Sequence, residues 1–233
     1  MNSFKIALLA TACAVAMSTS AFAAAAEPAM DAGNSIWAGP YVGIQLGGAS
    51  ATTEHTDLDD WYNDSKDFGT TDGAFIGGAK IGYDWMNGST IYGLFAEYSF
   101  SGIDTEKETT NGTDYSAGSD IKGLGSVRAK LGMATGDVSG AISVGLGYQN
   151  ADDKYTETDG SGQTIDANSD KLGWAFGLGT EYSVGNNATI GLDASHYVFG
   201  KKTHELQGLL AAGNFFTFQN TVSTGTISYN YKF

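Results

Sequence analysis

The sequence is poor in cysteine, proline and basic side chains, and each scarcity excludes a class of protein. Its one cysteine among 233 residues is Cys13, so the chain cannot form a disulfide framework of its own. Only two prolines, Pro28 and Pro40, accompany 33 glycines, which argues against a disordered linker or a collagen repeat. Twelve basic residues face 26 acidic ones, and the resulting net charge of -14 argues against nucleic-acid binding, which needs a basic face.

The sequence also lacks an apolar run long enough to cross a bilayer as a helix, which takes about 20 residues. The shorter run from Ile6 to Met17 follows Lys5 and precedes the small-x-small triplet AFA at residues 21–23, the pattern of a cleaved secretory signal. A lipoprotein signal cut before Cys13 is the alternative, but residues 10–12 (ATA) lack the expected large apolar residue. We therefore expect a signal peptide over residues 1–23 and a short periplasmic segment over residues 24–36.

The rest of the chain alternates apolar residues with small or polar ones, which is the two-residue period of a β-strand. In the first run, for example, Val42, Ile44 and Leu46 alternate with glycine and glutamine. Eight such runs lie near residues 42–47, 75–85, 92–100, 126–133, 142–149, 171–182, 190–195 and 226–233. The pattern predicts an all-β protein.

The connections between these runs alternate in length. They cover residues 50–72, 86–89, 101–119, 135–137, 150–169, 183–187 and 200–214. The short ones contain turn residues, such as Asn87-Gly88 and Gly136-Asp137. A strict long–short alternation sends every long loop to the same end, which is typical of transmembrane barrels with short periplasmic turns and long extracellular loops. The strands of a soluble β-sandwich would also alternate apolar and polar residues, but that fold does not require long and short loops to alternate.

The two faces of the expected strands differ in polarity. Lys80, Glu97, Arg128 and Asp193 share one face with many glycines, whereas large apolar residues occupy the other face. A protein that is apolar outside and polar within is stable only in lipid. We therefore predict an eight-stranded antiparallel transmembrane β-barrel over residues 37–233, with short periplasmic turns and long extracellular loops.

The same parity predicts a charge network in the lumen. Counted from the short turns, the four charged residues lie at similar depth, where unpaired charge is costly. We expect Glu97 to be flanked by Lys80 and Arg128, with Asp193 as a further partner across the lumen. Such a network would plug the barrel.

Aromatic residues gather near both ends of the outward faces, as expected of the girdles at the two membrane–water interfaces. Near the short turns lie Tyr83, Trp85, Tyr92, Tyr182, Tyr229, Tyr231 and Phe233, and near the long loops lie Tyr98, Phe100, Tyr148 and Trp174. Aromatic residues favour strands in general, so this observation alone is a modest support.

Three segments carry a resemblance to a known family: WAGPYVG at residues 37–43, GGAKIGY at residues 77–83 and YNYKF at residues 229–233. With them the chain resembles the small outer-membrane β-barrel (porin-family) proteins of alphaproteobacteria, relatives of the OmpA- and OmpW-type eight-stranded barrels. The resemblance implies location in the outer membrane. It also implies that Tyr229, Tyr231 and Phe233 form the signal read by the outer-membrane assembly machinery, although Ser228 stands where that signal usually has glycine.

Signatures of catalysis are missing from the sequence. It has no phosphate-binding glycine loop, no G-x-S-x-G elbow and no H-E-x-x-H pair. Of the three histidines, His55 and His204 fall in predicted loops and His196 falls near a strand end. Ser195 and His196 are adjacent in a strand, so they point to opposite faces and cannot act together as nucleophile and base. We expect no enzyme, no cofactor and no metal.

The predicted long loops are acidic. In residues 50–72 and 150–170 the acids are Glu54, Asp57, Asp59, Asp60, Asp64, Asp67, Asp72, Asp152, Asp153, Glu157, Asp159, Asp166 and Asp170. A solvated, self-repelling surface explains them most simply. Divalent-cation bridging to the anionic glycolipid outside is the functional alternative, although neither segment has the spacing of a calcium loop.

These observations predict a monomeric barrel with a structural or surface role in the Gram-negative envelope. Its expected partners are the outer-membrane lipids, lipopolysaccharide and, during biogenesis, the assembly machinery. A small passive diffusion pore is the alternative function. Eight strands leave an interior that side chains just fill, which favours the structural role, whereas the lumen glycines leave space and weaken that argument.

Overall fold

The computed structural model describes residues 35–57, 68–105, 107–109, 115–157, 164–205 and 215–233. The predicted signal peptide over residues 1–23 and most of the segment 24–36 lie outside these residues. No helix in the described part is long and apolar enough to cross a membrane. Every regular element there is a strand, and all pairings are antiparallel.

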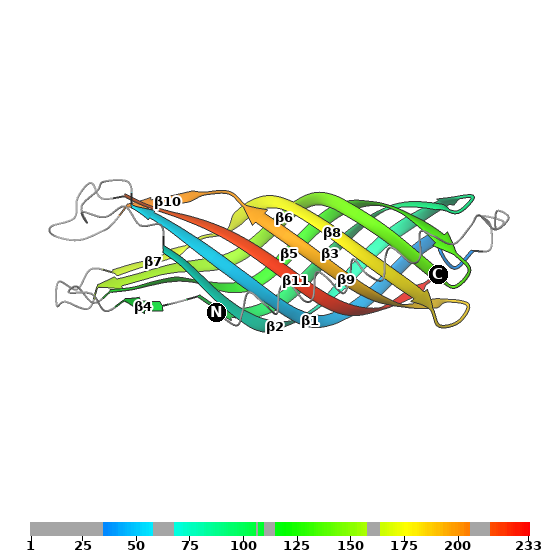
Figure 1. The fold of residues 1–233 in the computed structure, drawn as a ribbon, viewed down its shortest axis with the longest axis horizontal. Helices are drawn as coiled ribbons and strands as arrows, with labels where there is room; N and C mark the ends of the chain where they lie inside the picture. Colours follow the sequence, from blue (N-terminus) through cyan, green and yellow to red (C-terminus); the bar gives the residue numbers. More distant parts are fainter. Residues whose placement is uncertain (1–34, 58–67, 106, 110–114, 158–163, 206–214) are drawn as a thin grey trace.

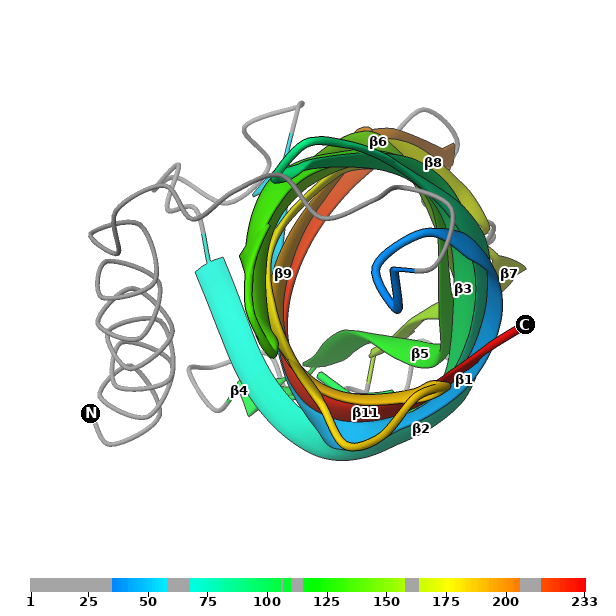
Figure 2. The same ribbon diagram turned by 90° about the vertical axis from the view of Figure 1, so that its right-hand side faces the viewer.

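Eight long strands form a closed ring (Figures 1 and 2). They are β1 (Gly39–Asp57), β2 (Phe68–Asn87), β3 (Thr90–Asp104), β5 (Tyr115–Thr135), β6 (Val138–Glu157), β8 (Lys171–Ser183), β9 (Ala188–Phe199) and β11 (Phe215–Lys232). Each strand pairs with the next, and β1 pairs with β11 from Tyr41↔Lys232 onward, which closes the barrel. The predicted eight-stranded antiparallel barrel is confirmed.

Three short strands extend the wall at the end away from the tight turns. They are β4 (Lys107–Thr109), β7 (Thr164–Asn168) and β10 (Lys202–Glu205). The segment β4 continues β3 alongside β5, β7 lies beside β6, and β10 lies beside β11. At this outer end the strands therefore form two groups, β2–β1–β11–β10 and β4–β5–β6–β7, which diverge at the left of Figure 1.

The long connections are shorter than the sequence predicted. Strand β1 continues to Asp57 and β2 begins at Phe68, so most of the predicted loop 50–72 is strand. The predicted loops 101–119, 150–169 and 200–214 likewise contain strand residues. Apolar alternation ends at the edge of the lipid, because a strand in water needs no apolar outer face. The periodicity therefore marked only the membrane-spanning part of each strand.

The tight turns at the opposite end have the conformation that their glycines permit. Gly88 and Gly136 have φ angles of 60° and 55°, a region that residues with a Cβ enter at a cost. These turns join β2 to β3 and β5 to β6 as hairpins. The turn residues in the sequence thus predicted the end of the barrel where the short connections lie.

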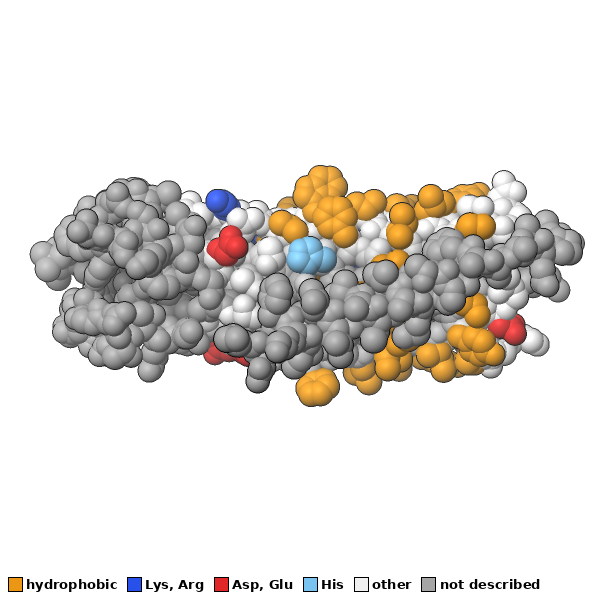
Figure 3. Space-filling model, in the orientation of Figure 1, with side chains coloured by type: hydrophobic (Ala, Val, Ile, Leu, Met, Phe, Trp, Pro, Cys, Tyr) orange, Lys and Arg blue, Asp and Glu red, His pale blue; other side chains and the backbone are white. Residues whose placement is uncertain are grey.

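The outer wall carries the apolar side chains. Phe75, Leu46 and Ile44 are 93%, 69% and 64% exposed, values that would be unfavourable in water. Figure 3 shows hydrophobic side chains over the middle and right of the barrel, with charged ones towards its two ends. The wall is thus an apolar band of the kind that lipid surrounds.

Both rims of this band are aromatic, and all eleven predicted girdle residues are exposed. At the short-turn end Trp85 stacks on Tyr92, with their rings 5.7 Å apart, and Tyr231 meets Phe233 edge-on at 5.2 Å. At the other rim Tyr98 meets Phe100 edge-on at 5.3 Å. These contacts order large rings where the wall meets the headgroups.

The lumen is filled in layers. An apolar layer in the outer half is formed by Ala49, Ala51, Ile76, Ile103, Ile121, Leu124, Ala151, Ala175, Tyr197, Phe199 and Val222. At the periplasmic mouth the chain before β1 turns inward, and Trp37 is 1% exposed against Met86, Ile91 and Ala134. The Trp37 indole N–H donates to the Gly136 carbonyl at 3.1 Å, which ties this plug to the β5–β6 turn.

Candidate functional site

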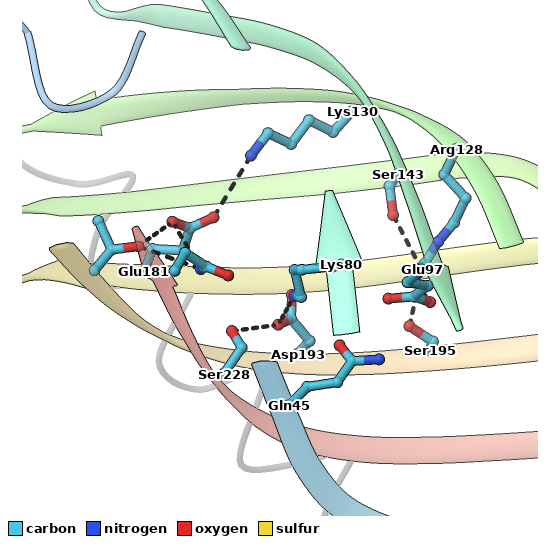
Figure 4. A network of polar contacts seen from close by, with 12 residues as sticks. Gln45, Lys80, Glu97, Arg128, Lys130, Ser143, Glu181, Asp193, Ser195 and Ser228 are labelled. Atoms are coloured by element: carbon cyan, nitrogen blue, oxygen red, sulfur yellow. Dashed lines mark hydrogen bonds and ion pairs between the residues drawn. The ribbon is translucent and has the colours of Figure 1, made fainter. Parts of the chain in front are cut away.

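The middle of the lumen holds an ion pair between Glu97 on β3 and Arg128 on β5 (Figure 4). Their side chains are 7% and 3% exposed. The Arg128 guanidinium also donates to Ser126 at 3.0 Å and to Ser195 on β9 at 2.8 Å, and the Tyr197 hydroxyl donates to Glu97 at 2.8 Å. This network joins β3 and β5 to β9 across the interior.

A second ion pair lies beside the first. Lys80 on β2 donates to Asp193 on β9 at 2.9 Å, and Ser228 on β11 donates to the same carboxylate oxygen at 3.3 Å. Lys80 is directly opposite Glu97 in the β2–β3 register, yet its ammonium contacts Asp193 across the lumen. Glu97 thus has Arg128 as its contact and Lys80 as its neighbour in register, as expected, while the ammonium of Lys80 pairs with Asp193 across the lumen and not with Glu97.

A further cluster nearer the periplasm was missed by the sequence reasoning. Asp84 on β2 lies 2.8 Å from Lys130 and 2.9 Å from Lys232, and Lys130 also lies 3.5 Å from Glu181 on β8. Thr189 donates to Glu181 at 2.7 Å. These charged residues have the same inward parity as the first four, so the alternation alone would have found them.

The two ion pairs form one charged layer, the cluster around Asp84 forms a second layer nearer the periplasm, and together the two layers balance in charge. Lys80, Arg128, Lys130 and Lys232 face an equal number of carboxylates, Asp84, Glu97, Glu181 and Asp193. Because desolvating a lone charge is costly, a neutral set of pairs is what a buried lumen tolerates. Aromatic rings also contact these cations. The Arg128 guanidinium carbon lies 4.7 Å from the centre of the Phe95 ring. The ammonium nitrogens of Lys130 and Lys232 each lie 5.1 Å from the centre of the Tyr41 ring.

The lumen glycines make room for these long side chains. A Cβ built on Gly177 would lie 2.3 Å from an Arg128 nitrogen, and one on Gly179 would lie 2.4 Å from an Asp193 oxygen. A Cβ on Gly147 would lie 3.0 Å from the Tyr197 ring. The space that the lumen glycines were expected to leave open is therefore occupied by side chains from other strands.

Two cavities among the described lumen residues are small. A cavity of about 40 Å³ lies among both charged layers, and another of about 10 Å³ lies beside Gln45, Ser99 and Tyr197. Since a cavity needs roughly 10–15 Å³ by this measure to hold a water, the larger cavity has room for water. A hydrated solute does not fit in either cavity.

The arrangement offers no catalytic pair at the position considered from the sequence. Ser195 points inward and accepts a hydrogen bond from Arg128, whereas His196 faces outward and bonds Ser223 at 2.9 Å. His55 and His204 lie in strands β1 and β10, contrary to the loops predicted for them. Within the described ranges, no three acidic, histidine or cysteine side chains are grouped as metal ligands.

The last residues of the chain lie on the lipid-facing wall. Tyr229, Tyr231 and Phe233 are 47%, 44% and 70% exposed, at the periplasmic rim. The Phe233 N–H donates to the Pro40 carbonyl at 3.1 Å, so the chain end is fixed against the start of β1. The predicted assembly signal thus has exposed aromatic side chains on an ordered strand.

The acidic outer segments are described only in part. Of the acids named from the sequence, Asp59, Asp60, Asp64, Asp67 and Asp159 lie outside the described residues. Asp152 pairs with Lys122, and Asp170 accepts hydrogen bonds from Tyr148 and Asn150. Asp153 is fully buried and lies 3.4 Å from Lys171. These contacts link neighbouring outer strands, so part of the acidic surface has a structural role.

Comparison with known proteins agrees with this architecture. The model of the outer membrane protein beta-barrel domain family matches residues 9–233. The chain belongs to this family. It is 28% identical over 207 residues to the 31 kDa outer-membrane immunogenic protein of Brucella melitensis, with 84% of each chain covered. It is 27% identical over 170 residues to a 22 kDa outer membrane protein of Rhizobium leguminosarum, covering 72% of this chain and 69% of that one.

Solved structures support the fold. The outer membrane protein OprG of Pseudomonas aeruginosa has a TM-score of 0.52 at 15% identity, covering 84% of this chain and 97% of its own. The outer membrane protease OmpT of Escherichia coli has a TM-score of 0.50 at 11% identity, with the same coverage. At such identities the likeness concerns the fold alone. Family and relatives together establish this chain as an outer-membrane β-barrel protein.

Proposed function

We propose that this protein is a closed, non-catalytic barrel with a structural and surface role in the outer membrane. The observation that carries the proposal is the filled lumen. Two charged layers, an apolar layer and the Trp37 plug follow one another along the axis, and the cavities among them measure about 40 and 10 Å³. Such an interior braces the wall and, over the described part of the barrel, would obstruct a solute moving along the axis.

The partners follow from the surface of the barrel. The apolar band suits the acyl chains of the bilayer, and the acidic outer strands suit divalent cations that bridge to lipopolysaccharide. The protein acts as a monomer, and its terminal Phe233 is read by the assembly machinery during insertion. The name of the Brucella relative, an immunogenic outer-membrane protein, supports exposure at the cell surface.

A diffusion pore is the rival function, and conductance separates the two. The purified barrel, refolded in detergent, is added to planar lipid bilayers in 1 M KCl, with a general porin as the positive control. We expect no steady channel, because the layers block the axis. Long-lived conductance steps from the unmutated protein, absent when the detergent buffer is added without protein, would replace the structural role with a pore.

A further inference from the structure

The barrel wall is interrupted at its outer end. Strands β2 and β3 pair only as far as Gly77↔Phe100, although β2 continues to Phe68 and pairs there with β1. Within the residues described, no pairing joins the outer part of β2 to β3 or β4. Among the described residues, one side of β2 therefore has no neighbouring strand over residues 68–76, and we call this side the free edge of β2; in Figure 2 the cyan start of β2 diverges from the ring.

Burial shows that this edge is open. Asp72 has the inward parity of its strand, yet it is exposed, whereas Ala51, its partner on β1, is fully buried. On the other side of the gap, a Cβ built on Gly102 of β3 would have nothing within 4 Å. The outer strands β4, β7 and β10 are only 3, 5 and 4 residues long, which is how proteins commonly blunt their edges. The edge of β2 lacks that protection.

Most of the edge, the part before Phe75, lies beyond the lipid. Phe75 and Phe100 are 93% and 71% exposed and mark the outer limit of the apolar wall on β2 and β3. Beyond them β2 carries Gly73, Asp72 and Thr71, which are small or polar and exposed. The free backbone groups of this segment are thus within reach of a molecule outside the cell.

We propose that this edge of β2 is a docking site for an extended, basic segment of another protein, which adds to the sheet as a further strand. Unpaired N–H and C=O groups in a row supply the backbone bonds of such strand addition. The preference for a basic segment follows from charge, because Asp72 lies on the edge strand, exposed Glu54 lies on β1 opposite Gly69, and the chain has a net charge of -14. This inference goes beyond the structural role and does not depend on whether the lumen conducts.

A second copy of the chain fits the edge less well. Two antiparallel β2 edges paired over residues 68–76 would be centred on Asp72, so two carboxylates would face each other. Directly opposed like charges destabilise a strand pair. A partner of opposite charge has no such penalty.

The test uses the refolded barrel in lipid nanodiscs and a labelled nine-residue peptide in which lysine alternates with valine and threonine. Fluorescence anisotropy gives the affinity, and hydrogen exchange reports the backbone. We expect saturable binding, at least tenfold weaker for the same peptide with alternate amides N-methylated, and slower exchange within residues 68–76. A glutamate-for-lysine peptide should bind at least tenfold more weakly. Equal binding of the N-methylated peptide, or no binding of the parent peptide, would overturn the proposal.

Substitutions in the chain test whether the peptide binds at the free edge of β2. Consecutive strand residues direct their N–H groups to opposite sides, so one of Thr70→Pro and Thr71→Pro blocks the free edge and the other disturbs the pairing with β1. The variant that still refolds should lose peptide binding. Asp72→Asn should weaken it several-fold, while Asp137→Asn at an exposed periplasmic turn should leave it unchanged. Concentration-dependent dimers that disappear in the proline variant would assign the edge to a second copy and overturn a basic partner.

Discussion

Lys130 lies across the lumen from Asp84, with its ammonium nitrogen 2.8 Å from the carboxylate oxygen Oδ2. The same oxygen lies 2.9 Å from the ammonium of Lys232, so one acid on β2 holds lysines from β5 and β11. Asp84 and both lysines are at most 10% exposed at their side chains. Three strands of the wall are thus tied together at one carboxylate, close to the periplasmic plug.

Removing that charge should destabilise the barrel strongly. In Asp84→Asn the lysines remain buried without their shared counter-charge, and we expect a loss of about 3–5 kcal/mol, as for broken buried pairs elsewhere. Urea unfolding in lipid vesicles measures it. The matched variant Asp137→Asn changes an exposed acid at a periplasmic turn and should stay within about 0.5 kcal/mol of the parent. Equal stability of both variants would show that water solvates the two lysines well enough to replace the lost carboxylate.

The pair Glu97–Arg128 should be energetically coupled. Each single variant, Glu97→Gln or Arg128→Gln, leaves one charge unmatched, whereas the double variant removes both. The double loss should therefore be smaller than the sum of the single losses by more than about 0.5 kcal/mol. The same unfolding assay measures all of them. Additive losses would mean that the two side chains act independently in spite of their contact.

Parity along the strands predicted which side chains enter the lumen, and depth suggested the contact of Glu97 with Arg128, but neither predicted that Lys80 pairs with Asp193. Lys80 and Glu97 lie at similar depth when counted from their short turn, so the sequence favoured their pairing, and the structure places them opposite each other in register. The closed ring, however, brings Asp193 of β9 across to Lys80, because the shear of the barrel shifts strands along one another. Shear depends on the pairing of all eight strands, which the alternation within one strand does not contain.

Three further features of the structure were indicated weakly or not at all by the sequence. Asp84 and Glu181 have the inward parity of the first network and could have been included with it. Trp37 stood in the sequence only as part of a family segment, and nothing in its surroundings predicted that it would turn back into the mouth. The free edge of β2 had no signal at all, since an edge is defined by the neighbour that a strand lacks.

The terminal aromatic residue should matter for assembly more than for stability. In Phe233→Ala we expect less barrel in the outer-membrane fraction of cells, while the purified variant refolds in detergent like the parent. Phe233 is 70% exposed to lipid and its backbone contact to Pro40 does not need the ring. Phe100→Ala removes a ring of similar exposure at the other rim and is the control. Normal amounts of Phe233→Ala in the membrane would make this ring an interface anchor only.

The lumen glycines provide a test of how tightly the interior is packed. In Gly177→Ala the new methyl would lie 2.3 Å from Arg128 and 2.6 Å from Ser143, and the guanidinium cannot retreat without losing Glu97 and Ser195. We expect a loss of about 1–3 kcal/mol in urea unfolding, the usual cost of overpacking. Gly225→Ala is the control, because nothing lies within 4 Å of its built Cβ, and it should gain about 0.5–1 kcal/mol from reduced chain entropy. A neutral Gly177→Ala would mean that the lumen is loose and wet.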